Sequence, residues 1–211
     1  MDIGKMSIYE IDVLKEIGNI GASSAATALA KILDKRVHLS LPEVRILEFK
    51  NVSQILGGEE MIVAGILQPM RGDMKGHTMF LLKVDAAHSL ADFLLTSMLN
   101  VKRDKARPTS DFNEMELSAL REIGNIMISS YISAIATMTG LKISPHVPEI
   151  SIDMAAAILS VPAIEFGKMG DHVLFIDTEF SQGCTMVEGY FFLIPDFNSY
   201  TVLLKALGVR G

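Results

Sequence analysis

The sequence predicts an α+β fold in which an internally duplicated, pseudo-two-fold chain packs long helices on an antiparallel β-sheet. Three observations predict it. The chain repeats itself at an offset of 106 residues, and each copy begins with a long helical pattern. Short β-branched and apolar runs, separated by Gly and charged turns, follow each of these helices.

The repeat is the strongest signal in the chain. Residues 8–46 align with residues 114–152 without a gap and are identical at 14 of 39 positions. Ordinary residue frequencies would give roughly two or three identities by chance. Near the end of each copy, Phe80–Asp85 resembles Phe191–Asp196 at an offset that has grown to 111, which predicts an insertion of about five residues in the second copy.

The copies are expected to form one domain rather than two, because their motif helices are expected to pack on a shared sheet and make the halves interdependent. The most charged stretch of the chain, residues 100–109, is interpreted as a surface connection between them. We therefore predict a single domain over residues 1–211 made of two homologous halves, about 1–103 and 104–211.

Both copies carry a helix start signal. Ser7 and Asn113 each stand three residues before a Glu, which is the spacing of a capping box. The helical patterns then run to about Leu33 and Met138, and Asp34 and Gly140 are expected at their ends. Two shorter helices are expected over residues 86–99 and 198–207. The strands are expected over residues 36–48, 61–68, 76–84, 142–153, 155–161, 172–177 and 184–194.

Composition excludes several classes of protein. With 49% hydrophobic and 21% charged residues, the chain is too apolar to be disordered, and its net charge of −6 argues against nucleic-acid binding. A single cysteine, Cys184, excludes a disulfide framework and a cysteine-based zinc site. The uncharged segment 123–141 is interrupted by Asn, Ser and Thr, which favours a buried amphipathic helix over a membrane span. Without a secretory signal pattern, a cytoplasmic protein is expected.

A polar stripe marks the first helix of each copy. At about 100° per residue, the stripe residues fall within roughly a 60° arc of one helix face. They are Asp12, Glu16, Asn19 and Ser23 in the first copy, and Ser118, Glu122, Asn125 and Ser129 in the second. A solvated helix face would look similar. However, Gly18 and Gly124, each just before an Asn, cost a helix interior about 1 kcal/mol relative to Ala, so we infer a retained use of Glu-x-Gly-Asn.

These residues carry a family resemblance. The patterns Asp12-x3-Glu16-x2-Asn19-x22-Pro42 and Ser118-x3-Glu122-x2-Asn125-x22-Pro148 resemble the signature of the CheC/CheX/FliY phosphatases of bacterial and archaeal chemotaxis. The match occurs twice at one offset and spans the whole chain, because the CheC branch of that family consists of two such halves.

The resemblance implies a phosphatase whose substrate is the aspartyl phosphate of a CheY-like response regulator. It implies that Asn19 and Asn125 position the attacking water and that Glu16 and Glu122 dock to the phosphate-binding lysine of the regulator. Asp12 and Ser118 are expected at the rim of this contact. No cofactor is expected on this chain, since the regulator itself brings Mg²⁺.

The resemblance also implies a second partner, the receptor deamidase CheD, and the presence of both halves in one chain favours a monomer. Pro42 and Pro148 are expected to shape a turn into a strand. The five His residues show no metal-ligand spacing, and neither a P-loop nor Gly-x-Ser-x-Gly occurs. The alternative is a non-catalytic module, related to flagellar switch proteins, that binds a response regulator without hydrolysing it.

Overall fold

In the computed structural model, the described residues are 8–33, 38–39, 43–48, 51–99, 111–166, 172–182 and 185–208. Six helices lie in these ranges: α1 (Ile8–Leu33), α2 (Val52–Leu56), α3 (Val84–Leu99), α4 (Glu114–Thr139), α5 (Ala155–Phe166) and α6 (Phe197–Ala206). The strands in the same ranges are β1 (His38–Leu39), β2 (Glu43–Glu48), β3 (Ile62–Gly72), β4 (Gly76–Lys83), β5 (Ile143–Pro145), β6 (Glu149–Met154), β7 (His172–Gln182) and β8 (Thr185–Pro195).

The strands form one antiparallel sheet in the order β1-β7-β8-β4-β3-β5, with β2 also paired to β7 and β6 also paired to β3. Each copy therefore lends a strand to the other: β2 pairs with β7 of the second copy, and β6 pairs with β3 of the first. That residues 1–211 form a single domain of two halves stays a prediction. The predicted boundary near residue 103 lies outside the described residues.

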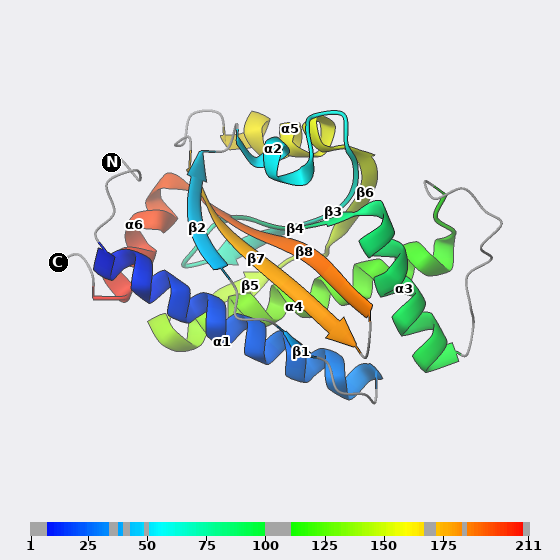
Figure 1. The fold of residues 1–211 in the computed structure, drawn as a ribbon. Helices are drawn as coiled ribbons and strands as arrows, with labels where there is room; N and C mark the ends of the chain where they lie inside the picture. Colours follow the sequence, from blue (N-terminus) through cyan, green and yellow to red (C-terminus); the bar gives the residue numbers. More distant parts are fainter. Residues whose placement is uncertain are drawn as a thin grey trace.

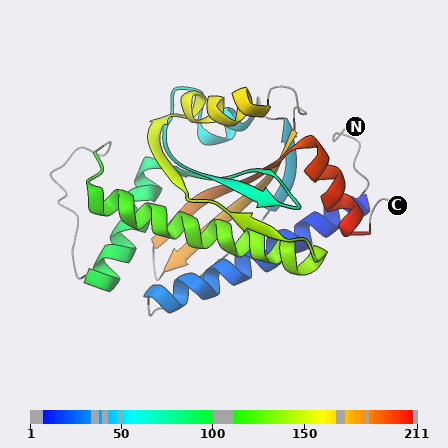
Figure 2. The same ribbon diagram turned by 180° about the vertical axis from the view of Figure 1, so that it is seen from behind.

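The sheet carries helices on both faces. Helices α1 and α4 lie side by side and run in opposite directions across one face, with α3 beside them, while α2 and α5 cover the other face (Figures 1 and 2). The sequence predicted the α+β class and the long helices on an antiparallel sheet. The second helical layer was not anticipated.

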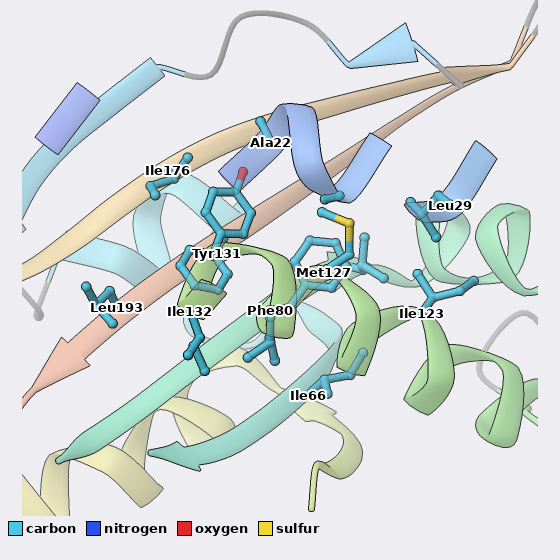
Figure 3. Packing of buried hydrophobic residues seen from close by; sticks show 14 of the residues in the cluster. Ala22, Leu29, Ile66, Phe80, Ile123, Met127, Tyr131, Ile132, Ile176 and Leu193 are labelled. Atoms are coloured by element: carbon cyan, nitrogen blue, oxygen red, sulfur yellow. The ribbon is translucent and has the colours of Figure 1, made fainter. Parts of the chain in front are cut away.

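The larger core lies between the sheet and the pair α1 and α4. Tyr131 of α4 is fully buried and stacks on Phe191 of β8 with 4.2 Å between the ring centroids. Ile66 and Phe80 of the sheet and Ile123 of α4 belong to the same buried cluster (Figure 3). Apolar residues at i, i+3 and i+4 supply the buried side of each long helix, so the opposite side is left to solvent.

The helix ends follow the predicted signals. Asn113 accepts a hydrogen bond from the backbone N–H of Glu116, whose carboxylate in turn accepts from the backbone N–H of Asn113, which completes the capping box. Gly140 ends α4 with φ of 71°, a left-handed conformation that glycine adopts without strain. The equivalent signals at Ser7 and Asp34 lie outside the described residues.

The prediction of a strand over residues 155–161 is wrong, because these residues form the first turns of α5. Three alanines open this segment, and Ala155, Ile158 and Leu159 bury a helical i, i+3, i+4 face against the sheet. The helix has 12 residues where α2 has 5, and the offset between the copies grows in this region. The predicted insertion is therefore accommodated by a longer helix.

Two smaller differences concern the strands. The expected runs 36–48 and 142–153 each contain two strands, β1 with β2 and β5 with β6. Helix α2 follows Asn51 and was not anticipated.

No helix among the described residues is both long and apolar enough to cross a membrane.

Candidate functional site

The first site lies on the N-terminal half of α1. Asp12 and Glu16 are exposed and Asn19 is half-buried, so the stripe runs from solvent toward the edge of the helix that meets the sheet. Lys15 donates to Asp12 across 3.4 Å, and both side chains are largely exposed. A pair this exposed adds little to stability, so Asp12 remains accessible to a partner.

The second site lies at the matching place on α4. Ser118 and Glu122 are exposed and Asn125 is half-buried, as in the first copy. Here the carboxamide of Asn125 has a partner, because Nε2 of Gln68 on β3 donates to its Oδ1 over 3.2 Å. The same Nε2 also donates to the backbone carbonyl of His146. The second Asn is therefore tied to the sheet.

The glycine before each Asn sets how closely its helix approaches the sheet. A Cβ added to Gly18 would lie 2.7 Å from Cγ2 of Val44, and one added to Gly124 would lie 2.5 Å from Cδ1 of Ile66. Ordinary carbon contacts are about 3.5–4.0 Å, so a side chain at either position would push the helix away. The glycines thus have a packing role, and that role places the neighbouring Asn at the margin between helix and sheet.

The two sites occupy equivalent places in the sheet as well. In the first copy Val44 pairs with Ile176. The equivalent of Val44 in the second copy is Ile150, and it pairs with Ile66. Gly18 accordingly approaches Ile176 and Gly124 approaches Ile66. The duplication seen in the sequence is a duplication of the whole arrangement of helix, glycine and strand.

Comparisons with known proteins match both copies of the repeat. The model of the CheC-like family matches residues 10–46 and 115–152, which are the two motif helices and the strands that follow them. The CheY-P phosphatase CheC of Bacillus subtilis is 32% identical over 206 residues, and the alignment covers 94% of each chain. The chain belongs to the CheC-like family.

Two further matches carry the name FliY. The flagellar motor switch phosphatase FliY of B. subtilis is 26% identical over 151 residues, which are 72% of this chain and 38% of that one. The crystal structure of Thermotoga maritima FliY superposes with a TM-score of 0.74 at 21% identity, over 98% of this chain and all of that one. The latter likeness establishes the shared fold.

The remaining signature positions are less prominent. Pro148 is half-buried and directly precedes β6, where its fixed φ suits the entry into a strand. Its counterpart Pro42 lies outside the described residues, as does Cys184. Ser23 is exposed and Ser129 half-buried, and both stand one turn beyond the Asn of their helix. Within the described ranges, no three His, Cys, Asp or Glu side chains gather as metal ligands would.

Sequence reasoning missed Gln68. It lies 57 positions from Asn125 and belongs to neither the repeat nor the signature. The one available signal was a lone carboxamide at the end of an apolar run predicted to be a strand, and nothing in that run indicates which helix the residue faces.

Proposed function

We propose that this chain is a protein phosphatase that hydrolyses the aspartyl phosphate of a phosphorylated CheY-like response regulator. The observation that carries the proposal is the exposed Glu and half-buried Asn one turn apart, present at equivalent places on α1 and α4. The name of the B. subtilis relative, CheY-P phosphatase, supports the same reaction.

The reaction needs little from the phosphatase. An acyl phosphate is already activated, because its carboxylate is a good leaving group. The regulator supplies the Mg²⁺ and the lysine that hold the phosphoryl group. A water molecule attacks phosphorus in line, the bond between phosphorus and the aspartyl oxygen breaks, and the carboxylate and inorganic phosphate are released. The phosphatase must mainly place that water and exclude unproductive geometries.

Asn19 and Asn125 are the residues we assign to the water. A neutral carboxamide can accept a hydrogen bond through its oxygen and donate one through its nitrogen, so it can hold a water in one orientation without adding charge beside the phosphoryl group. Both Asn side chains are half-buried at the helix edge, which restricts their motion while leaving part of each accessible.

Glu16 and Glu122 are assigned to docking. Each is exposed one turn before its Asn, where a carboxylate can meet the lysine of the regulator's active site and fix the register of the two proteins. Asp12 and Ser118, one turn earlier again, would lie at the rim of the same contact.

An open site suits a protein substrate. The two Glu residues are exposed and the two Asn residues are half-buried on a pair of helices, and a convex helix can enter the active-site cleft of another protein. A hollow of about 700 Å³ is lined by other residues, which belong to β3, β4 and the turns beside them: Pro69, Met70, Arg71, Lys75, Gly76, His77 and Asp196. The assigned residues are thus better placed for docking than for enclosing a small molecule.

The family resemblance adds three further expectations. CheD is expected as a second partner, the chain is expected to be a cytoplasmic monomer, and Mg²⁺ is expected to enter with the regulator. Sedimentation with and without CheD would test both CheD binding and the monomeric state. If both expectations hold, the chain sediments as a monomer alone and as a one-to-one complex with CheD.

The second candidate is a binding module that contacts a response regulator without hydrolysing its phosphate, since the exposed carboxylates of Glu16 and Glu122 could dock a partner without any catalysis. The two candidates separate in a decay assay with purified protein, Mg²⁺ and phosphorylated CheY. A phosphatase accelerates phosphate release at substoichiometric amounts. A binding module leaves the decay rate unchanged or slows it, and it does so only at stoichiometric amounts.

A further inference from the structure

The contact between Gln68 and Asn125 concerns the orientation of the second carboxamide. Gln68 is only 1% exposed, and with Ile66 and Met70 it lies on the side of β3 that faces the α1 and α4 layer. Its Nε2 donates to Oδ1 of Asn125 over 3.2 Å and to the backbone carbonyl of His146.

The carbonyl of His146 fixes which way round both amides lie. A backbone carbonyl can only accept, so the end of Gln68 that meets it must be the NH₂ group. The atom of Asn125 that meets the same NH₂ group must then also be an acceptor, which is Oδ1. If Asn125 turned over, two NH₂ groups would face each other at a buried position and the hydrogen bond would be lost.

The orientation of Asn125 leaves its Nδ2 as the group available to donate toward a docked partner. Its Oδ1 keeps one lone pair, since an amide oxygen has two. A water placed beside Asn125 would therefore meet a donor and one acceptor in fixed positions, rather than an amide that can present either end.

Gln68 is also a costly residue for packing alone. Its Oε1 is buried without a hydrogen-bond partner among the described residues, and an unsatisfied buried carbonyl is unfavourable. An apolar side chain of equal length would fill the same space without an unpaired oxygen. Retaining a carboxamide here is understandable if its NH₂ group has a task.

We propose that Gln68 is a positioning residue that holds Asn125 in its reactive orientation, so that the second site is pre-organised. The inference rests on the proposed phosphatase function. The register of the sheet makes Ile176 the counterpart of Ile66, and two residues further along β7 the counterpart of Gln68 is Thr178. The residue type thus differs between the copies, because threonine carries a hydroxyl group and no amide group.

The experiment uses two backgrounds, each with one site left. Asn19→Ala leaves the second site and Asn125→Ala leaves the first, and the turnover of phosphorylated CheY is measured in each with and without Gln68→Met. Methionine keeps the length of the side chain and removes the unpaired oxygen together with the donor, so the fold should persist.

In the Asn19→Ala background we expect Gln68→Met to lower kcat about 5- to 10-fold with KM within about twofold, since the hydrogen bond that orients Asn125 is lost together with the one to the carbonyl of His146. In the Asn125→Ala background there is no carboxamide to orient, so the same substitution has no target. Gln68→Glu places an acceptor opposite Oδ1 of Asn125. It should lower kcat at least as much, and again only in the Asn19→Ala background.

Thr78→Val is the matched control. Thr78 is fully buried, pairs with Gln68 across the sheet and donates to its backbone oxygen over 3.0 Å, but has no recorded contact with Asn125. It should leave kcat of the Asn19→Ala background within about twofold.

Equal losses in both backgrounds would assign Gln68 to general stability, and an unchanged kcat in the Asn19→Ala background would overturn the positioning role. In either case the proposed function would stand, provided the backgrounds themselves accelerate decay of the phosphorylated regulator. If neither background does, the proposed function fails and the inference fails with it.

Discussion

Gly124→Ala tests whether the close approach of α4 to the sheet is required. The new Cβ would lie 2.5 Å from Cδ1 and 2.8 Å from Cγ2 of Ile66, a side chain with no exposed surface. Relief requires a shift of about 1 Å in a packed core, since carbon contacts are normally about 3.5–4.0 Å. Helix α4 or β3 must therefore move.

The magnitude follows from two opposing effects. Overpacking of this kind costs about 3 kcal/mol at the upper end of its usual range, whereas replacing a helical Gly by Ala gains about 1 kcal/mol. The net loss is about 2 kcal/mol in the free energy of unfolding. For a chain of this length it corresponds to a melting temperature lower by about 4–8 °C.

The assay is urea and thermal unfolding followed by circular dichroism, with Ile66→Ala and the double variant completing a cycle. Ile66→Ala alone leaves a cavity and should cost about 2–5 kcal/mol. In the double variant the new methyl group enters that space. The stability lost in the double variant should therefore be at least 1 kcal/mol smaller than the sum of the losses in the two single variants. A gain of about 1 kcal/mol for Gly124→Ala alone, or strict additivity in the cycle, would refute the packing role of this glycine.

Two further predictions concern the site carboxylates and a buried phenol. Replacing Glu16 and Glu122 together by Gln should raise KM for the phosphorylated regulator about tenfold and weaken its salt dependence, while both residues' exposure keeps the melting temperature within about 2 °C. An unchanged KM in steady-state phosphate release would remove Glu from docking. Burial, followed by the nearby charges of Glu188 and Asp177, raises the pKa of Tyr190 from 10.0 to about 12. The folded state favours the neutral phenol more strongly than the unfolded state does. The contribution of this preference to the free energy of unfolding is complete below pH 10 and is lost as the pH rises through about 12. Tyr190→Phe should therefore flatten the fall in stability between pH 10 and 12 in urea titrations, and an identical fall in the variant would contradict the shift.

The sequence was most informative where local signals repeat. The helix boundaries near Leu33 and Met138 agree with the structure within one residue, because cap, periodicity and Gly140 all act over one or two turns. The candidate residues Glu16, Asn19, Glu122 and Asn125 do share one accessible helix face in each copy, as fixed spacing on a helix requires.

Features that depend on distant contacts were not accessible. The segment that forms α5 has no charges until its end and exposes Ile164 to 82%, so it lacks the polar face by which a surface helix is recognised. The pairing of β2 with β7 and of β6 with β3 leaves no local trace, because either copy could have paired its own strands. Gln68 was missed for the same reason, since its partner lies on another element.

The central claim is that the two Asn side chains carry the hydrolysis. Its most direct test is single-turnover release of phosphate from phosphorylated CheY in the presence of Mg²⁺ and excess Asn19→Ala/Asn125→Ala protein, compared with the wild type. Our account predicts that the double variant binds the regulator and melts as the wild type does, yet releases phosphate at the rate of the regulator alone. Release at the wild-type rate by a folded double variant would contradict it.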